Sequence, residues 1–458
     1  MLCYERKIEE MKTLKIPLKA IRTSLLMYAG GGMMMVSVKA QSNILTLNQT
    51  IEMALSNSNA LKLKRSAIDL AVNKYNQSKD LSLPTGSVSG SFSHAEIPAN
   101  HIRLGSLDWI LPDRADSYNA NVALSETVFN GFKLKYARAS TLLLAEMAKT
   151  NVALSEDEVI YTAVQMYFDL YKVIQSQKIV QQNMLAIEKL IQQADQFYRH
   201  GIVTKNDVLR FRLQKSAIEI TASDLEANRK IICYNMTVLL GLPEDTDLKS
   251  GQVLLKEDVP APLSQYVDFA FAERKELKQN DLQYKVEEFS FKTIQAEELP
   301  KLSVNAGLKY LHAGSTFIPV NGNFIAPISI GATVSWDFST LWMNKNKRSE
   351  IKIRQQQTSI EKNIWTDKIR TEVNQAYQLY QRALNKVALL HSSIDEAAEN
   401  DRMQEDRYKN NVTTVTDRID ADAKLYQALT DLEIARADAS VAWYNLLKVS
   451  GKISTINQ

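Results

Sequence analysis

Three aspartates near the C-terminal end of the chain, Asp417, Asp420 and Asp422, are the residues of this sequence whose spacing best suits joint action on a ligand. Closely spaced carboxylates attract cations, and a narrow passage lined by them would favour cations and bind blocking ones. Acidic residues equally suit the first turns of a helix, where the backbone N–H groups favour negative charge. In an earlier, similar stretch the positions of Asp420 and Asp422 are held by Arg210 and Arg212, so the two stretches differ in charge.

No other set of residues has the spacing of a catalytic or metal site. The histidines lack ligand spacing with Cys or carboxylates, and there is no phosphate loop, nucleophile elbow or zinc helix motif. These histidines are His94, His101, His200, His312 and His391. The sequence therefore predicts no catalytic residue, no metal and no cofactor, and an enzyme is the weakest of the functional alternatives.

The aspartates belong to a stretch that occurs twice, because residues 196–241 align without a gap with residues 406–451. The identical pairs are Tyr198/Tyr408, Thr204/Thr414, Asp207/Asp417, Ala227/Ala437, Tyr234/Tyr444, Asn235/Asn445 and Gly241/Gly451. Each copy indicates a helix end, a tight turn at Gly201 or at Asn410 and Asn411, and a second helix that ends at a glycine. Glycine and asparagine tolerate the left-handed backbone that such turns need. The large separation predicts a duplicated half-molecule and not a short-repeat solenoid.

Glycine and proline are excluded from two long stretches of the chain. Of the 10 prolines none lies between Pro112 and Pro243 or after Pro327, and Gly201 is the sole glycine between Gly131 and Gly241. Since these residues break helices, we expect long helices at residues 130–200, 206–240, 340–409 and 414–450. Seventy residues of helix span roughly 105 Å.

Four segments alternate apolar and small polar residues with period two, which is typical of strands. They lie at residues 84–94, 118–129, 301–311 and 326–337, with a long loop between the first two. We further expect single helices at residues 47–81 and 266–298. The organisation is then a first repeat at 41–241, an equatorial linker at 242–262, a second repeat at 263–451 and a tail at 452–458.

Residues 1–40 have the pattern of a secretory signal peptide, with basic residues before an apolar run and a small-x-small site at Val38–Ala40. The alternative is a single membrane anchor, but the run is short and holds three consecutive glycines. Without this segment the formal net charge changes from +3 to −1, so nucleic acid is not implied as a partner. No later apolar run is long enough to span a membrane.

Strands of about ten residues with this alternation are typical of outer-membrane β-barrels, with lipid outside and water inside. An ordinary half-buried sheet packed on helices is the alternative. Four strands are too few to close a barrel, so several copies would have to contribute. Helices of about 100 Å exceed the membrane thickness of about 30 Å and would project into an aqueous compartment. The predicted class is α+β, mostly α, with two repeats that each hold a strand pair and very long helices.

The ordered set of motifs resembles the TolC-like outer-membrane efflux proteins, the outer membrane factors of tripartite efflux and type I secretion systems. The matching motifs are Leu45-Thr46-Leu47, Ala54-Leu55 with Asn57, Leu83-Pro84, Leu299-Pro300, Leu124-Ser125, Phe129-Asn130-Gly131, Tyr198 to Gly201, and Tyr408 with Thr414 to Tyr426. The resemblance implies a homotrimer with a 12-stranded β-barrel continuous with a periplasmic α-helical barrel. It implies an exit duct in the outer membrane that contacts lipid, a periplasmic adaptor and an inner-membrane pump.

The resemblance also assigns roles to individual residues. Asp417 and Asp420 match positions where the family narrows its periplasmic entrance with acidic rings, and Asp422 follows them. Tyr408 and Asp207 would join a hydrogen-bonded clasp at the tip, although the basic residue that the family can place near 413 is Thr413 here; both could also be ordinary turn residues. Independently of the resemblance, the position of Trp336, Tyr310 and Tyr118 near strand ends predicts an interfacial aromatic girdle.

Two departures from the family concern local turns. The segment Trp336 to Ser339 is shorter and lacks the glycine expected after the last strand of the second half, and Arg274 to Leu277 stands where the family often has proline. The alternative function from another class is a periplasmic coiled-coil structural or adaptor protein without a pore.

Overall fold

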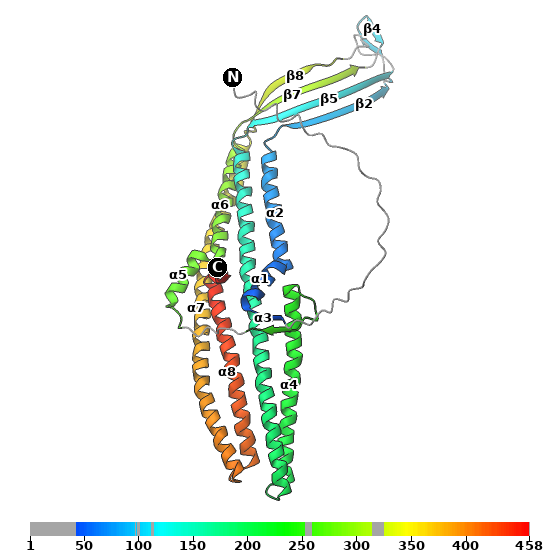
Figure 1. Ribbon diagram of the computed structural model, residues 1–458. Coiled ribbons are helices and arrows are strands. Elements are labelled where there is room, and N and C mark those ends of the chain that lie inside the picture. The colour runs from blue at the N-terminus through cyan, green and yellow to red at the C-terminus, as the bar shows by residue number, and fades with distance from the viewer. Residues whose placement is uncertain are drawn as a thin grey trace, which may run out of the picture. The chain divides into compact units, whose positions relative to one another are not determined.

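The computed structural model describes residues 43–96, 98, 101–110, 114–251, 259–313 and 325–457. The predicted signal peptide at residues 1–40 lies outside the described residues. Residues 42–458 form one compact unit, and Figure 1 shows its elements. Among the described residues, no helix is both long enough and apolar enough to cross a membrane.

Two hairpins of long helices dominate this unit (Figure 1). The first joins α3 (Lys133–Arg199) to α4 (Lys205–Leu240), and the second joins α7 (Thr340–Lys409) to α8 (Val415–Val449). Helix α3 packs against α4 and α8, so the hairpins contact each other. The computed structure is therefore mostly helical, as its glycine and proline distribution predicts.

The two tip turns are built from the same residues. Thr204 and Thr414 each accept a hydrogen bond from the backbone N–H three residues on, and Asp207 and Asp417 each accept one from the backbone N–H of the threonine. These reciprocal bonds satisfy N–H groups that the start of a helix leaves unpaired. The duplicated threonine–aspartate pair is thus explained by helix capping.

The shorter helices come in two broken pairs, α1 (Leu47–Asn57) with α2 (Asn59–Asp80) and α5 (Leu263–Glu273) with α6 (Lys275–Ala296). The expectation of single helices at 47–81 and 266–298 was wrong. Ser58 and Arg274 have extended ψ angles of 114° and 120°, which end one helix and start the next. Both halves of the chain contain the same break.

Four strands form one antiparallel sheet in the order β2-β5-β7-β8. They are β2 (Thr85–Glu96), β5 (Arg114–Phe129), β7 (Lys301–Ala313) and β8 (Ile328–Ser335). The central β5–β7 pairing joins the two halves of the chain. Strands β2 and β8 are the edges of the sheet, each with one side unpaired among the described residues.

Two small sheets lie outside the predicted strands. Strand β1 (Asn43–Leu45) pairs in parallel with β6 (Leu248–Ser250) of the linker. Strands β3 (His101–Leu104) and β4 (Leu107–Ile110) form a hairpin within the segment that was expected to be a long loop. The chain turns between them at Gly105, whose φ is +65°.

The largest core lies where α1, α3, α4, α8 and β6 meet. Its fully buried aromatic residues, Tyr167 and Phe168, pack edge to face with ring centroids 5.8 Å apart. The Tyr167 hydroxyl donates to the Leu45 carbonyl oxygen at 3.2 Å, and Asn57 Nδ2 donates to the Leu240 carbonyl oxygen at 2.7 Å. These bonds attach β1 to the middle of α3 and α1 to the C-terminal end of α4. A final 3₁₀ helix, η3 (Ile453–Asn457), packs here through the buried Ile453.

Candidate functional site

One face of the four-stranded sheet is apolar and open to solvent in the single chain. Paired positions across the sheet place Val88, Val122, Leu308 and Ile328 in one row. Their exposed fractions are 79%, 38%, 41% and 78%. Exposed apolar patches of this kind mark contact with another protein or with a membrane.

The opposite face carries small polar side chains that bond to each other. Ser125 Oγ donates to Asn305 Oδ1 at 2.7 Å, and Asn305 Nδ2 donates to Thr333 Oγ1 at 3.0 Å. These side chains satisfy one another's hydrogen bonds, and they face water without carrying a charge. The two faces therefore differ as the lipid and lumen faces of an outer-membrane barrel strand differ.

Aromatic residues lie near both ends of the apolar face. At the end away from the helices, the Tyr118 ring contacts Phe92 with centroids 5.0 Å apart and His312 at 6.0 Å. At the helix end, the half-exposed Trp336 packs on Phe338 and donates from Nε1 to the Glu298 carbonyl oxygen at 3.0 Å.

Polar pairs begin just beyond the outer aromatic residues. On the same face, His94 and Asp116 pair at 2.6 Å one register step further from the helices than Phe92 and Tyr118. Tyr310, the third predicted girdle residue, is partly buried on this face one step inside them and pairs with Ala120. The apolar band therefore has aromatic boundaries at both ends.

The tips of the two hairpins are joined by an apolar cluster around Tyr408. This ring is 2% exposed and contacts Phe197 of α3 and Phe211 of α4, with centroids 5.9 and 5.8 Å apart. Arg210 of α4 also donates to the Thr416 hydroxyl of α8. The hairpins therefore meet at their tips through packing and one polar contact.

Tyr408 and Asp207, which were predicted to join a hydrogen-bonded clasp, do not bond to each other within the single chain. The Asp207 carboxylate instead accepts from the Thr204 hydroxyl and backbone N–H, at 2.7 and 2.9 Å. The Tyr408 hydroxyl is buried and has no hydrogen-bond partner among the described residues. Burial, and secondarily the negative charge of Asp207, raises the pKa of Tyr408 to about 12. The two residues are neighbours, but helix capping occupies the carboxylate.

Asp417 and Asp420 are exposed near the start of α8. Asp417 is the capping residue described above, and the hydrogen bonds donated by Thr414 lower the pKa of its carboxyl. Asp420 pairs with Lys424 at 2.7 Å across an exposed helix turn. Both side chains reach water, as residues of an acidic ring would have to.

Asp422 does not share that exposure. Its side chain is 4% exposed and lies 3.8 Å from the guanidinium of Arg418, which is also paired with Asp401 of α7. The prediction that Asp422 lines a passage disagrees with this burial, because the helical periodicity turns it from the side of Asp420 into the α7–α8 contact. Burial raises the pKa of the Asp422 carboxyl to about 6, with the Asp401 charge adding to the effect and Arg418 opposing it.

The raised pKa of Asp422 predicts a pH-dependent stability. Between its unfolded value near 4 and its folded value of about 6, the native state binds a proton that the unfolded state does not, so this residue's contribution becomes more favourable as pH falls. We expect Asp422→Asn to raise the free energy of unfolding by about 2 kcal/mol at pH 7.5 and by about half as much at pH 5, the middle of that window. Thermal unfolding of the detergent-extracted protein at both pH values measures this.

The control is Asp420→Asn, which removes the same charge from an exposed position and should change stability by less than about 0.5 kcal/mol. Equal stabilisation by Asp422→Asn at both pH values would contradict the assignment.

The turn residues adopt the same backbone conformation at the two tips, since His200 and Asn410 have φ angles of −90° and −95° and each is followed by a left-handed residue. Gly201 has a φ of +74° and Asn411 a φ of +57°, both in the left-handed region. Asn410 has a φ of −95°, and its Nδ2 donates to the Asp406 carbonyl oxygen at 2.8 Å. Asn411 therefore supplies the left-handed turn residue, and the Asn410 side chain caps the end of α7.

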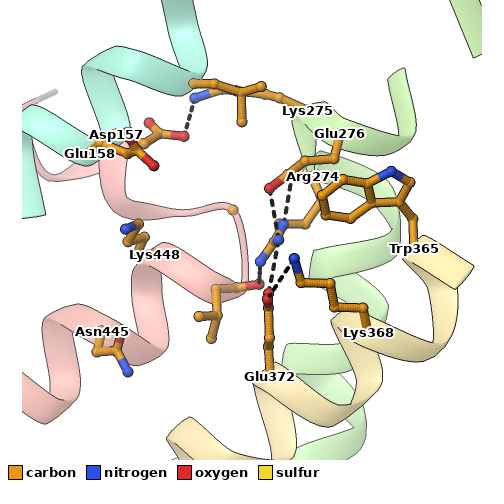
Figure 2. Close-up of a pocket in the computed structure, with 13 residues that line it drawn as sticks. Asp157, Glu158, Arg274, Lys275, Glu276, Trp365, Lys368, Glu372, Asn445 and Lys448 are labelled. Atoms are coloured by element: carbon orange, nitrogen blue, oxygen red, sulfur yellow. Dashed lines mark hydrogen bonds and ion pairs between the residues drawn. The ribbon is translucent and has the colours of Figure 1, made fainter. Parts of the chain in front are cut away.

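An open cleft of about 320 Å³ lies where α3, the α5–α6 break, α7 and the end of α8 meet (Figure 2). The Arg274 guanidinium lies 2.7 Å from Glu276 and 2.9 Å from Glu372, and donates to the Val449 carbonyl oxygen at 3.1 Å. Its φ of −65° is the value that proline fixes, so arginine keeps that backbone and adds ion pairs.

Lys275, the next residue, pairs with the buried Asp157 of α3 and donates to the Ala153 carbonyl oxygen at 3.1 Å. The cleft is lined by four basic and four acidic residues: Arg274, Lys275, Lys368, Lys448, Asp157, Glu158, Glu276 and Glu372. The cleft has no net charge to select a ligand, and the contacts of Arg274 and Lys275 join α6 to α3, α7 and α8. Sequence reasoning missed these contacts, because the partners lie far apart in the chain and no spacing rule links them.

Stripes of exposed apolar residues run along the outer surfaces of the helices. On α4, Ile220 and Ile231 are 65% and 60% exposed, and on α7 Ile353, Ile360 and Ile364 are 53%, 58% and 59% exposed. Spacings of four, seven and eleven residues keep one face of a helix in line. Within the part of the chain that the structure describes, no group of three metal-ligating residues is present.

Comparisons with known proteins agree with this architecture. Residues 50–242 match the family described as outer membrane efflux protein. The chain is similar to the outer membrane efflux protein BepC of Brucella suis biovar 1 (strain 1330), with 23% identity over 342 residues that cover 73% of this chain and 72% of BepC.

Two solved structures extend the similarity over most of the chain. The outer membrane protein VceC of Vibrio cholerae has a TM-score of 0.71 at 14% identity and covers 88% of this chain and 96% of VceC. The Campylobacter jejuni CmeC outer membrane channel has a TM-score of 0.72 at 15% identity and covers 89% of this chain and 86% of CmeC. At these identities the structures show that the fold is shared.

Proposed function

From the match of residues 50–242 to the outer membrane efflux protein family and the similarity to BepC, we propose that three copies assemble into an outer-membrane exit duct. The duct conducts substrates passively from an inner-membrane pump or type I exporter to the exterior. A periplasmic adaptor joins the pump to the helical hairpins. The sheet crosses the outer membrane, and the long helices form the periplasmic extension.

The observation that carries this proposal is the exposed apolar face of a sheet with two open edges. Unpaired strand edges are not tolerated in hydrocarbon, so they must pair. In a threefold assembly, β2 of one copy pairs with β8 of the next, and three sheets of four strands close a 12-stranded barrel.

The height of the apolar band fits a membrane. From Leu302 to His312 the strand β7 advances ten residues, which at about 3.4 Å per residue and a tilt of about 40° gives roughly 26 Å. This matches the outward-facing apolar band of about 25 Å in outer-membrane barrels. The aromatic residues at its two ends, with Trp336 at the inner boundary and Tyr118 at the outer, suit an interfacial girdle.

The exposed stripes on α4 and α7 support contacts between copies. Ile220 and Ile231 on one copy and Ile353, Ile360 and Ile364 on another have the regular spacing with which parallel helices pack. Their burial would continue the threefold contact from the sheet into a helical barrel. A periplasmic adaptor or coiled-coil protein without a pore is less well supported, because it gives no reason for an apolar sheet face.

The sheet faces can be tested with a matched pair of arginine substitutions. Ile330→Arg places a charge on the apolar face, where it should destabilise insertion by about 2–4 kcal/mol near the bilayer midplane. Ser329→Arg places the same charge at the adjacent position of β8, on the polar face, and we expect trimers to persist because that face is proposed to contact water. The measurement is the amount of detergent-extracted trimer in purified outer membranes. Equal loss in both variants, or a soluble periplasmic monomer for the unsubstituted protein, would refute the proposed assembly.

We also propose that Asp417 and Asp420 form acidic rings at the periplasmic tip. In single-channel recordings, the double variant Asp417→Asn with Asp420→Asn is expected to lower cation selectivity and to weaken block by multivalent cations from the periplasmic side by about tenfold or more. Asparagine retains the capping oxygen at 417, so the helix start is preserved. Unchanged selectivity and unchanged block would leave these residues with a capping role alone.

A further inference from the structure

The polar face of the sheet carries very little charge. Apart from two lysines, every residue whose position falls on this face within the four strands is uncharged. The two lysines are Lys301 and Lys309 of β7, and both are exposed. No acidic residue among the strand positions described on this face offsets them.

The two lysines have different surroundings. Lys301 lies at the base of the sheet in an open hollow with Glu297 and Asp337, so acidic groups stand close to it. Lys309 lies further out, and its cross-strand partner on β5 is Asn121, which in turn pairs with Ser89 of β2. On its other side, its backbone N–H donates to the Pro327 carbonyl oxygen at 3.1 Å.

The positions next to Lys309 on the same face are also uncharged. One register step inward lie Gly307 and Ala123, and one step outward lie Leu311 and Asn119. Small side chains leave room around the ammonium group, and no ion pair joins it to another described residue. Lys309 is therefore an unscreened positive charge on a neutral surface.

We propose that Lys309 is a specificity-determining residue that binds anionic groups of the cargo in the outer part of the duct. This inference rests on the proposed function, since the threefold barrel places the polar face inside and sets three copies of Lys309 at one level. Twelve strands about 4.8 Å apart and tilted by about 40° give a backbone radius of roughly 12 Å.

A ring of this size acts across the whole passage. The lysine side chains extend inward from the backbone, and the Debye length at physiological ionic strength is about 8 Å. The positive potential of the ring therefore reaches the axis, where it favours phosphate and carboxylate groups and opposes cations. The acidic residues Asp417 and Asp420 are at the opposite end of the duct, so the two ends have charges of opposite sign.

The test is single-channel recording of the purified trimer in planar bilayers. Tripolyphosphate is added on the extracellular side, at the end of the duct that the sheet forms. We expect tripolyphosphate to block the unsubstituted channel from this side. Lys309→Gln should raise the half-blocking concentration at least about tenfold, because three positive charges are removed from the ring. Lys309→Arg should keep it within about twofold, because the charge remains.

The matched control is Glu126→Gln, which changes one charge per chain on the apolar face of the same sheet, at a position paired with Val304. It should leave the block unchanged. Conducting trimers that tripolyphosphate does not block, or that it blocks equally with glutamine at 309, would overturn the role of Lys309 while leaving the duct intact. Failure of every variant, including the unsubstituted protein, to form trimers and conduct would overturn the proposed function, and the role of Lys309 with it.

Discussion

Replacing Gly131 by alanine is expected to lower the free energy of unfolding by about 3 kcal/mol or more. Gly131 has a φ of +68° at the corner between β5 and α3, and a Cβ there would overlap the carbonyl oxygen of Ala296 and lie 3.0 Å from the Leu299 Cβ. Ala296 ends α6 just before β7. The substitution would therefore separate the two strand–helix junctions that connect the sheet to both halves of the helical region.

The matched control for this prediction is Gly105→Ala in the β3–β4 turn. Gly105 has nearly the same φ, +65°, but nothing lies within 4 Å of its Cβ position. Its substitution should cost only the conformational term of about 1–2 kcal/mol. Thermal unfolding of the extracted protein and the amount of trimer in the outer membrane measure both variants. Equal losses of stability in the two variants would show that the overlap with Ala296 does not contribute.

Replacing Lys275 by methionine is expected to destabilise the protein by about 3–5 kcal/mol at pH 7.5, because it leaves the Asp157 carboxylate buried without its cation. The Asp157 side chain is only 10% exposed, and its Oδ1 has no hydrogen-bond partner among the described residues. Desolvation already raises the pKa of Asp157, and Lys275 opposes this rise. Without the lysine the carboxyl will take up a proton more readily, so the loss of stability should shrink as pH falls toward 5.

A second substitution separates the unpaired charge from the lost contacts. Adding Asp157→Asn to Lys275→Met removes the buried charge, and we expect it to recover most of the stability at neutral pH. Lys278→Met, at an exposed position on the same helix, should change stability by less than about 0.5 kcal/mol. A double variant as unstable as Lys275→Met alone would show that packing, and not the charge of Asp157, is the cause.

The long helices and the four sheet strands could be predicted from the sequence because their signals are local and repeated. The absence of glycine and proline between Gly131 and Gly201 leaves the chain no place to break. Alternation in β2 and β8 is visible in the sequence because successive side chains of a strand point to opposite faces of the sheet, and these two faces differ in polarity. The resemblance predicted from the motifs is confirmed, because residues 50–242 match the outer membrane efflux protein family and the chain is similar to BepC.

The helix breaks could not be predicted in the same way. Ser58 caps the start of α2 by accepting a hydrogen bond from the Leu61 N–H, but serine also occurs inside helices, and arginine is a good helix former. At Arg274 the ion pairs to Glu276 and Glu372 hold the break, and Glu372 belongs to a different helix. The β3–β4 hairpin is different, because Gly105 and Ser106 between two short apolar segments are a recognised hairpin signal that was overlooked.

The candidate tip residues show where local spacing stops being informative. Asp417, Asp420 and Asp422 look alike in sequence, yet the first caps a helix, the second is exposed and the third is buried against Arg418. Which side of α8 packs on α7 decides between exposure and burial. That choice depends on how the helices pack, and the polar pattern of one segment does not contain it.

The pairing of β1 with β6 has a consequence for the order in which the protein can mature. Asn43 pairs with Leu248, so β1 can pair only after all of α1 to α4 and the start of the linker have been synthesised. Closing so long a loop costs entropy and slows folding. A chain that stopped at Gly241 would contain the entire first repeat but no partner for β1. The first repeat alone therefore lacks the partner of β1 and the β7 partner of β5, although the sequence repeats as if each half were complete.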